Sequence, residues 1–572
     1  MSAEPVEKPW IGRSVERHED AALLTGTARF MDDLGVAPGT LHAAFVRAPL
    51  AHAKVSAIDT TAAAACDGVQ AVITGADIAA FCRPFTVGVK APMEHRPVAV
   101  DRVRYQGEPV AVVLGDTPYT AEDGAALVEV AYDPLPAVVD PRAAMAEDAP
   151  LLHPEVGANV VADRRFRYGD PEAAFADAAH AISIDITYPR NSVTPIECSG
   201  LIAEYHSGTD SYEVTSNFQG PFALHPVMAL ALQVPANRLR LKSPPASGGS
   251  FGTKQSVFPY IVACCVASRI VGRPVKWIED RLEHLMAGTS ATNRVTTLTA
   301  AVEADGRITA LDWDQIDDCG AYLRAPEPAT IYRMHGNMTG AYDIRHVAIR
   351  NRNVLTNKTP SGLVRGFGGP QVYFALERLV HNIACQLGLE PLEVIKKNLI
   401  AAGAFPYRTA SGGLYDSGDY PAAVALAEAD GRLQRLQERR QDVCAAGGLY
   451  GIGMAAIVEP SISNMGYITT VLTADERARA GPKGGAVATA TVGVDALGSV
   501  SAHISSVPQG QGHETVIAQV VADGLGLTPD TIAVNTDLDT GRDAWSVASG
   551  NYSSRFSGAV TGAAKLAADR LR

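Results

Sequence analysis

Three glycine-rich segments constrain this chain more than any other feature, because each stands directly before a stretch with the apolar spacing of a helix. They cover residues 247–255 (SGGSFGTKQ), 364–371 (VRGFGGPQ) and 508–515 (PQGQGHET). Glycines allow backbone N–H groups to approach a ligand closely, and the start of a helix adds partial positive charge there. Each segment alone is explained equally well as a tight turn, so it is their combination that indicates a binding site.

The neighbours of these glycines narrow the kind of ligand. In the first segment Gly252 is followed by Thr253 and Lys254, whereas a phosphate-cradling P-loop requires Gly-Lys-Ser/Thr, so that interpretation fails. In the second, Arg365 and Phe367 among glycines indicate an anion clamp beside a flat ligand; a helix-start loop with a buried phenylalanine is the alternative. The third segment fits a phosphate at a helix start, although a lone G-x-G is weak evidence.

The first part of the chain, up to about residue 141, mixes short valine-rich runs with turns. Runs bounded by Gly, Pro or Asp predict strands. They cover residues 41–46, 70–74, 110–114 and 127–132. A helix is predicted over residues 116–130, with Thr120 as its N-cap. The pattern is that of an α+β domain.

Beyond a proline-rich break at residues 133–136 and an extended linker at 151–162, strands alternate with longer helices. The predicted strands are 181–188 and 211–216, and the predicted helices are 221–232, 369–387 and 560–571. A polar helix at 432–443 marks a boundary, after which 451–459 and 486–494 begin a second strand-rich unit. We therefore expect domains over residues 1–145, 146–425 and 426–572.

Composition excludes several classes of function. The 572 residues include 49 basic and 62 acidic side chains, a net charge of −13, which provides no basic surface for nucleic acid or anionic lipid. The eight cysteines form no C-x-x-C pair, so zinc or iron–sulfur sites are not expected, and we interpret them as buried apolar residues in a reducing compartment. The start, MSAEPVEKPW, has no apolar secretory core, and no run is long enough to span a membrane. A cytoplasmic protein is expected.

Taken together, SGGSFGTK, VRGFGGPQ and GQGHET, in this order and separation, resemble the molybdenum hydroxylases of the xanthine dehydrogenase/aldehyde oxidase family. The flanks agree with this resemblance. Residues 15–33 (VERHEDAALLTGTARFMDD) and 103–113 (VRYQGEPVAVV) look like the N-terminal hammerhead domain, and 169–180 (GDPEAAFADAAH) looks like the start of the cofactor domain. The implied fold is a hammerhead domain followed by an incomplete molybdopterin-binding region of mixed sheets and helices.

The resemblance implies a pyranopterin cofactor, expected in its cytosine dinucleotide form, that holds molybdenum without a protein side-chain ligand. The protein then supplies positioning and electrostatics. Family members hydroxylate small molecules at an aldehyde carbon or a C–H bond beside a ring nitrogen. The oxygen comes from water, and electrons leave through 2Fe-2S and FAD centres, which are expected here on partner subunits.

Residue by residue, the resemblance implies these roles. Gln219 stands where the family has a glutamine hydrogen-bonded to the apical oxygen, and Phe251 and Gly252 lie on the loop above the metal. Arg365 and Gly366 contact the pterin end of the site, and Phe367 forms a wall of the substrate pocket. Arg333 is either a substrate-orienting arginine or part of a structural ion pair. The remaining cofactor-binding residues are Gly510, Gln511, Gly512, His513, Thr515, Ser553 and Ser554.

Two differences between this sequence and the family's pattern bear on which substrate it can bind. Gln255 occupies the position where purine-oxidising members have a second substrate-binding carboxylate. A neutral amide can hydrogen-bond to a purine but cannot pair with its charge or take its proton, so a purine is disfavoured. Residues 358–364 contain no cysteine, which excludes the copper–thiolate site of carbon monoxide dehydrogenases.

The family's general base is a glutamate in a Gly-Glu motif, and no such motif follows Arg555. Glu514 is interpreted instead as an acid that stabilises a helix start. A split subunit, a truncated chain and non-hydroxylating chemistry each explain the absence. We favour the first, in which a second molybdenum-cofactor subunit carries the glutamate. The alternatives are a hydratase or dehydrogenase on the same cofactor, and a non-catalytic pterin-binding subunit.

Overall fold

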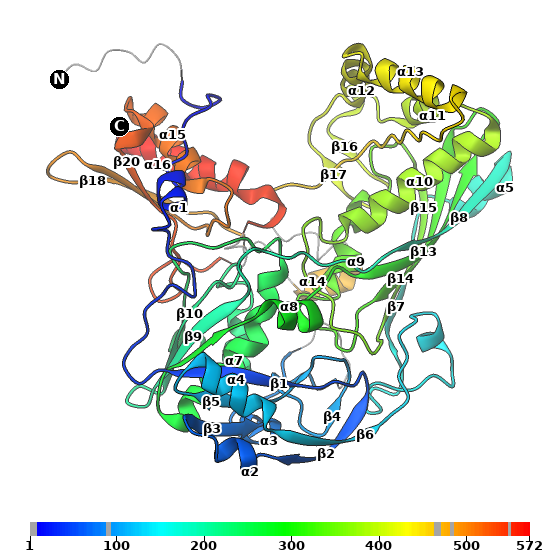
Figure 1. The fold of residues 1–572 in the computed structure, drawn as a ribbon. Helices are drawn as coiled ribbons and strands as arrows, with labels where there is room; N and C mark the ends of the chain where they lie inside the picture. Colours follow the sequence, from blue (N-terminus) through cyan, green and yellow to red (C-terminus); the bar gives the residue numbers. More distant parts are fainter. Residues whose placement is uncertain (1–8, 87–92, 463–470, 481–485, 547–550) are drawn as a thin grey trace.

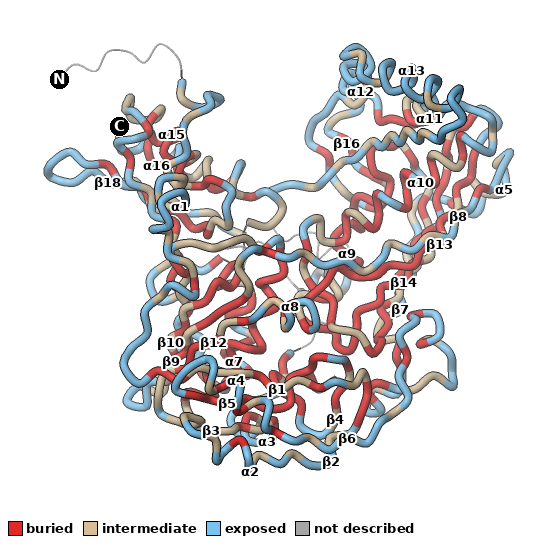
Figure 2. The backbone as a smooth tube through the Cα atoms, viewed as in Figure 1, coloured by how far each residue is buried: buried red, intermediate tan, exposed pale blue. Residues whose placement is uncertain are grey.

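The computed structural model describes residues 9–86, 93–462, 471–480, 486–546 and 551–572. The fold is α+β, as the sequence predicts, with helices and strands interleaved along the chain (Figure 1). Buried residues concentrate in the sheets and in the helices that cover them (Figure 2). Across the described residues no helix has the length and apolar character that a membrane crossing requires.

The largest sheet joins strands from both sides of residue 145. Its seven strands run in the order β11-β10-β9-β12-β1-β5-β3. Their bounds are β1 Leu41–Arg47, β3 Val69–Thr74, β5 Pro109–Gly115, β9 Gly200–His206, β10 Ser211–Ser216, β11 Leu239–Lys242 and β12 Val275–Ile278. The two halves meet where β1 pairs in parallel with β12, with Leu41 opposite Val275. The first predicted domain and the second therefore share one sheet and one core.

The helix predicted at residues 116–130 is shorter in the structure, where α4 spans Pro118–Ala126. Its N-cap is Thr117, not Thr120. The Thr120 N–H donates to the Thr117 hydroxyl at 3.1 Å, and the Thr117 N–H donates to the Thr120 hydroxyl at 3.0 Å, which is a reciprocal capping box. The helix ends early because β6 (Glu129–Pro134) pairs with β2 (Ala53–Asp59) in a small sheet that also contains β4 (Arg102–Val103).

The second large sheet has five strands, in the order β7-β15-β14-β13-β8. The strands are β7 Val160–Tyr168, β8 His180–Tyr188, β13 Asn293–Val302, β14 Ile308–Asp318 and β15 His346–Val354. The amphipathic helix α10, Gly369–Leu387, covers one face of this sheet and has the bounds predicted from the sequence. Each valine, leucine or isoleucine side chain that α10 buries against the sheet contributes about 1.5–3 kcal/mol.

Two other predicted elements differ in the structure. The helix predicted at 221–232 is reduced to α6, His225–Ala231, because Pro226 favours the first helical turn and residues 220–224 form a turn before it. The strand predicted at 451–459 is absent. Its alternating burial is present, but Ala456 N–H donates to the Glu377 carboxylate on α10 at 3.0 Å, and the Val458 carbonyl accepts from the Tyr373 hydroxyl at 2.7 Å. Side chains of α10 thus form hydrogen bonds with the backbone groups that would otherwise bond to a neighbouring strand.

The polar helix predicted at 432–443 is confirmed as α13, Arg432–Ala445, which buries no residue. Most cysteines are buried or half-buried, but the expectation of burial is wrong for Cys385 and Cys444, which are exposed.

The C-terminal unit contains a three-stranded sheet, β18-β19-β20, with β18 Ala490–Val494, β19 Val500–Ile504 and β20 Ile532–Asn535. Helices α15 (His513–Leu525) and α16 (Thr561–Leu571) pack on it and on each other. Gly524 allows their close approach, because a Cβ there would lie 2.8 Å from the Ala568 Cβ. Helix α16 therefore buries Ala564 and Ala568 in this unit, while Leu566 and Leu571 are exposed.

Two long-range connections attach this unit to the rest of the molecule. The first is an N-terminal strap, residues 10–19, that lies along α15 (Figure 1). Trp10 N–H donates to Asp523 Oδ1 at 2.6 Å, and its indole N–H donates to the Leu527 carbonyl at 3.1 Å. The side chain of Gln519 donates to the carbonyls of Trp10 and Arg13 at 2.8 and 3.0 Å.

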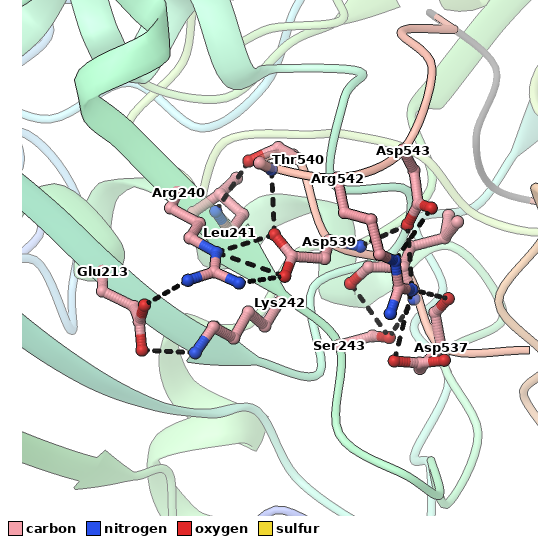
Figure 3. A network of polar contacts seen from close by, with 12 residues as sticks. Glu213, Arg240, Leu241, Lys242, Ser243, Asp537, Asp539, Thr540, Arg542 and Asp543 are labelled. Atoms are coloured by element: carbon pink, nitrogen blue, oxygen red, sulfur yellow. Dashed lines mark hydrogen bonds and ion pairs between the residues drawn. The ribbon is translucent and has the colours of Figure 1, made fainter.

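The second connection is an ion-pair network between β11 and the loop at residues 537–543 (Figure 3). Arg240 contacts both oxygens of Asp539, with Nε–Oδ1 at 2.9 Å and Nη2–Oδ2 at 2.5 Å, and its Nη1 donates to Glu213 at 3.0 Å. Leu241 and Thr540 exchange two further hydrogen bonds. The network therefore joins the C-terminal unit to the edge of the seven-stranded sheet.

Candidate molybdenum-cofactor site

The first glycine-rich segment makes a sharp turn between β11 and the helical residues that follow. Phe251 and Gly252 both have left-handed backbone conformations, with φ of 52° and 107°. A Cβ at Gly252 would lie 2.5 Å from Leu363 Cδ2 and 2.6 Å from the Leu363 carbonyl oxygen. Only glycine fits there, because the first loop packs directly against the chain that leads into the second.

Gln219 is buried beside this first loop, and its amide orientation is defined. The Ser250 hydroxyl accepts from the N–H groups of Gly252 and Lys254, each at 3.3 Å, so its own hydrogen is available to Gln219 Oε1 at 2.5 Å. With Oε1 accepting from Ser250, the Nε2 hydrogens are the donors that Gln219 offers.

The second glycine-rich segment meets the first through Arg365. Its backbone N–H donates to the Phe251 carbonyl at 2.7 Å, and its guanidinium lies 5.2 Å from the Phe251 ring centre. Phe367 has a φ of 35°, and a Cβ at Gly368 would lie 2.2 Å from the Thr330 carbonyl oxygen. Two strained loops, each followed by helical residues, thus share one contact zone that includes Phe251, Gly252, Leu363 and Arg365.

Arg333 is buried, and its guanidinium faces this second loop and a carboxylate. Nη1 donates to the Gly366 carbonyl at 2.6 Å, and Nη2 pairs with Glu459 Oε1 at 2.7 Å and reaches Ser553 Oγ at 3.4 Å. The structure therefore places Arg333 as a brace between the second loop, the 459 region and Ser553. These contacts match the ion-pair alternative for its role.

The third glycine-rich segment lies next to residues 551–556, which we call the bridging segment. The Asn551 side chain accepts from the Ser506 hydroxyl at 2.7 Å and donates to the Val507 carbonyl at 2.8 Å. The buried His513 ring stacks on Phe556, with ring centres 3.6 Å apart and planes at 5°. Burial lowers the pKa of His513 to about 4, so the ring is neutral near pH 7. Gly510 and Gln511 are exposed at the tip of the loop.

Thr515 is placed differently from the other residues of this loop. Its hydroxyl donates to Glu19 Oε2 at 2.6 Å, and the Glu514 N–H donates to Glu19 Oε1 at 3.1 Å. The N-terminal strap thus puts a carboxylate at the start of α15, where the sequence predicts an anionic ligand. Glu514 itself accepts from the Thr536 hydroxyl at 2.9 Å.

The bridging segment connects all three loops. Tyr552 OH donates to the Gln219 carbonyl at 3.0 Å and accepts from Gln255 Nε2 at 3.0 Å. Ser553 contacts Arg333, whereas Ser554 is exposed and its carbonyl accepts from Ser557. No individual role was predicted from the sequence for Ser250, Tyr552, Arg555 or Glu19. Ser250 lies inside the first glycine-rich segment and Glu19 inside the hammerhead-like stretch 15–33, and Tyr552 and Arg555 belong to a stretch, 549–555, that resembles the family's pterin-lining loop.

The loops and the bridging segment hold buried polar atoms that lack partners among the described residues. They are Ser247 Oγ, Gln255 Oε1, His513 Nδ1, and Nε and Nη1 of Arg555. Arg555 is 3% exposed, and burial lowers its pKa without a carboxylate to offset the cost. A negatively charged group bound beside Arg555 would satisfy its guanidinium N–H groups, which fits the diphosphate of a pterin dinucleotide, whereas Gln255 Oε1 can only accept and requires a donor. Within the described ranges no three His, Cys, Asp or Glu side chains gather as metal ligands.

Comparison with known proteins agrees with this geometry. Sequence models of the molybdopterin cofactor-binding domain match residues 152–399 and 423–572. The model of the aldehyde oxidase and xanthine dehydrogenase a/b hammerhead domain matches residues 25–136. The class defined by fold and site is thus a hammerhead protein with two molybdopterin cofactor-binding domains.

Individual proteins with similar sequences or structures are oxidoreductases, or subunits of oxidoreductases, of the same class. The nicotine 6-hydroxylase large subunit of Paenarthrobacter nicotinovorans is 33% identical over 94% of this chain and 65% of its own length. The 6-hydroxypseudooxynicotine dehydrogenase complex subunit gamma of the same organism is 33% identical over 98% of this chain and 68% of its own. Quinoline 2-oxidoreductase from Pseudomonas putida 86 superposes with a TM-score of 0.89 at 31% identity, covering 100% of this chain and 72% of that one.

The chain belongs to the molybdenum hydroxylase family and corresponds to its molybdopterin-binding large subunit. It spans slightly less than two thirds of the length of the nicotine 6-hydroxylase large subunit.

Proposed function

We propose that this chain is the molybdenum-cofactor subunit of a multi-subunit hydroxylase that oxidises an aldehyde or a C–H bond beside a ring nitrogen. The observation that carries this proposal is the bridging segment, which ties Gln219, Gln255 and Arg333 to the third glycine-rich loop. Residues that the family resemblance assigns to one site come from four distant parts of the sequence and are joined here by hydrogen bonds.

In this proposal Gly510, Gln511, Gly512, His513, Ser553, Ser554 and Arg555 hold the cofactor, in its cytosine dinucleotide form. The exposed tip at Gly510 and Gln511 leaves backbone N–H groups available to phosphate oxygens. Arg555 supplies the buried positive charge that a diphosphate would neutralise. Thr515 acts indirectly, since its hydroxyl is engaged by Glu19.

When bound, the cofactor supplies a two-electron oxidation coupled to transfer of oxygen from water. Gln219 directs its Nε2 donors at the reacting group because Ser250 occupies Oε1. The Phe251–Gly252 backbone and Phe367 shape the pocket, and Arg365 keeps Phe251 in place by stacking. Arg333 holds the second loop through the Gly366 carbonyl and therefore acts as a positioning residue.

Partners complete the proposed enzyme. Glu514, the carboxylate of the third loop, faces Glu19 and Thr536, so we do not assign it the general-base role. A glutamate on a second molybdenum-cofactor subunit is our proposal for that role. Subunits with 2Fe-2S and FAD centres would accept the electrons. The name of the relative described as subunit gamma of a dehydrogenase complex supports a multi-subunit assembly. The cytoplasmic location stays a prediction.

Turnover in ¹⁸O-labelled water tests this function. The purified complex should convert an aldehyde or N-heteroaromatic compound to a product that carries one oxygen atom from water, with an artificial electron acceptor and no need for dioxygen. Product that lacks the label, or product without net oxidation, would contradict a hydroxylase and favour a hydratase on the same cofactor.

A further inference from the structure

The Tyr552 hydroxyl stands between two glutamines of the proposed site. Tyr552 begins the 3-10 turn Tyr552–Ser554 and lies 333 positions from Gln219 and 297 from Gln255. Both contacts measure 3.0 Å, one to the main-chain carbonyl of Gln219 and one to the side-chain amide of Gln255. A single oxygen atom of the C-terminal unit therefore connects the two residues.

Hydrogen counting fixes the orientation of the Gln255 amide. A carbonyl oxygen can only accept, so the one hydrogen of the Tyr552 hydroxyl is directed to Gln219. The tyrosine oxygen must then accept from Gln255, and the atom of Gln255 that faces it has to be Nε2. Amide oxygen and nitrogen are otherwise interchangeable by shape, so this contact is what defines which way the amide points.

The consequence is that Gln255 Oε1 points away from Tyr552. Gln255 is 4% exposed, and Oε1 is buried with no hydrogen-bond partner among the described residues. A buried acceptor left unsatisfied costs about 1–3 kcal/mol. Gln219 is arranged in the opposite sense, since Ser250 occupies its Oε1 and leaves its Nε2 as donor. The two amides thus present one donor and one acceptor.

We propose that Tyr552 locks Gln255 as a hydrogen-bond acceptor, so that the substrate carries an N–H or O–H donor at this point. The inference rests on the proposed function and narrows its substrate class. It favours hydroxylated or lactam-type N-heteroaromatic compounds and protonated amines. It disfavours simple azines and aldehydes, which offer only acceptors.

The test compares the affinity of the oxidised, molybdenum-loaded complex for 2-pyridone and its N-methyl derivative, which differ in one N–H donor. Wild-type protein should bind 2-pyridone about tenfold more tightly, the value of one hydrogen bond. In Tyr552→Phe the amide is free to turn, and the affinity ratio should fall to about threefold or less. Should Tyr552→Phe fail to fold, Gln255→Met removes the acceptor and should lower the ratio in the same way.

Tyr415→Phe is the matched control. The Tyr415 hydroxyl also donates to a backbone carbonyl, that of Gly340 at 2.9 Å, and accepts from a side-chain amide, Asn337 Nδ2 at 3.3 Å, but it lies outside the site. This variant should lose stability and keep the ratio.

A wild-type ratio near one, an unchanged ratio in Tyr552→Phe, or failure of both probes to bind would overturn the inference. Turnover in labelled water is measured in parallel. Loss of labelled product with the ratio intact would count against the proposed function and leave the orientation of Gln255 standing.

Discussion

Glu19 and Thr515 are 496 positions apart in the sequence, and the Thr515 hydroxyl donates to the Glu19 carboxylate at 2.6 Å. The same carboxylate accepts from the backbone N–H of Glu514 at 3.1 Å. The N-terminal strap therefore caps the helix that follows the third glycine-rich loop, and it does so with a charge of the sign that a helix start favours.

Replacing Glu19 with alanine should destabilise the C-terminal unit by about 1–2 kcal/mol, because α15 loses a charged cap. Hydrogen exchange of the α15 backbone amides in increasing urea measures the effect in this unit. Glu16→Ala removes the same charge from an exposed position of the strap and should be close to neutral. Equal losses in the two variants would show that Glu19 acts only through net charge.

Glu514 should make stability depend on pH. Burial, followed by the influence of Glu19, raises the pKa of Glu514 to about 7. For Glu19, burial acts to raise the pKa, but hydrogen bonds from Glu514 and Thr515 outweigh it and lower the pKa to about 2. Glu514 therefore holds the proton, and the stability associated with its protonated form is fully present below its unfolded pKa and lost as pH rises through about 7.

Glu514→Gln keeps an acceptor for Thr536 and cannot ionise. Its melting temperature should match that of the wild type near pH 5 and exceed it above about pH 8. Thermal unfolding across that range measures the difference. Parallel curves for the two proteins would mean that Glu514 is already ionised in the folded state.

The ion-pair network at β11 should hold the C-terminal unit against the large sheet. Arg240→Met leaves Asp539, whose side chain is 10% exposed, without its main partner. Because Arg240 is 46% exposed and screened by water, we expect a loss of about 1 kcal/mol and faster proteolysis near residues 537–543. Arg238→Met breaks the pair with Asp210, in which both side chains are 47% exposed, and should change neither quantity. Similar proteolysis of both variants would refute the proposed connection.

Arg555 should lower the stability of the cofactor-free protein and strengthen the binding of the cofactor. Its Nε and Nη1 atoms are buried without partners among the described residues, so the charge costs free energy until an anion binds. Arg555→Met should therefore raise the melting temperature of the cofactor-free chain and lower the molybdenum content of protein purified from cells. A variant that is less stable without cofactor and equally rich in molybdenum would refute this role.

Local patterns were sufficient to predict much of the fold. Helix α10 has the predicted bounds because its apolar spacing is strong and Gly388 follows it in a left-handed conformation. The prediction of a strand at residues 451–459 was wrong, and the cause is a set of long-range contacts that a local sequence pattern does not reveal. The alternation is genuine, but Glu377 and Tyr373 of α10 bind the backbone of this segment in place of a strand.

The site was predictable to the extent that its residues lie in glycine-rich motifs. The first two loops pack together, with Arg365 against Phe251 and Leu363 against Gly252, since close packing of two loops requires the glycines that mark them. The roles of Tyr552 and Glu19 could not be predicted, because they arise from contacts with residues up to 496 positions away. Ser250 lies inside the first motif, but its contact with Gln219 is visible only in the structure. The ion pair of Arg333 with Glu459, which bears on its proposed role, is likewise a contact that no spacing rule indicates.

The most direct measurement is the molybdenum and pterin content of the complex purified from cells that supply the cofactor. We predict one molybdenum per chain, together with a pterin and an equal amount of cytidine monophosphate released by acid. A folded complex that contains this chain but neither molybdenum nor pterin would contradict the account.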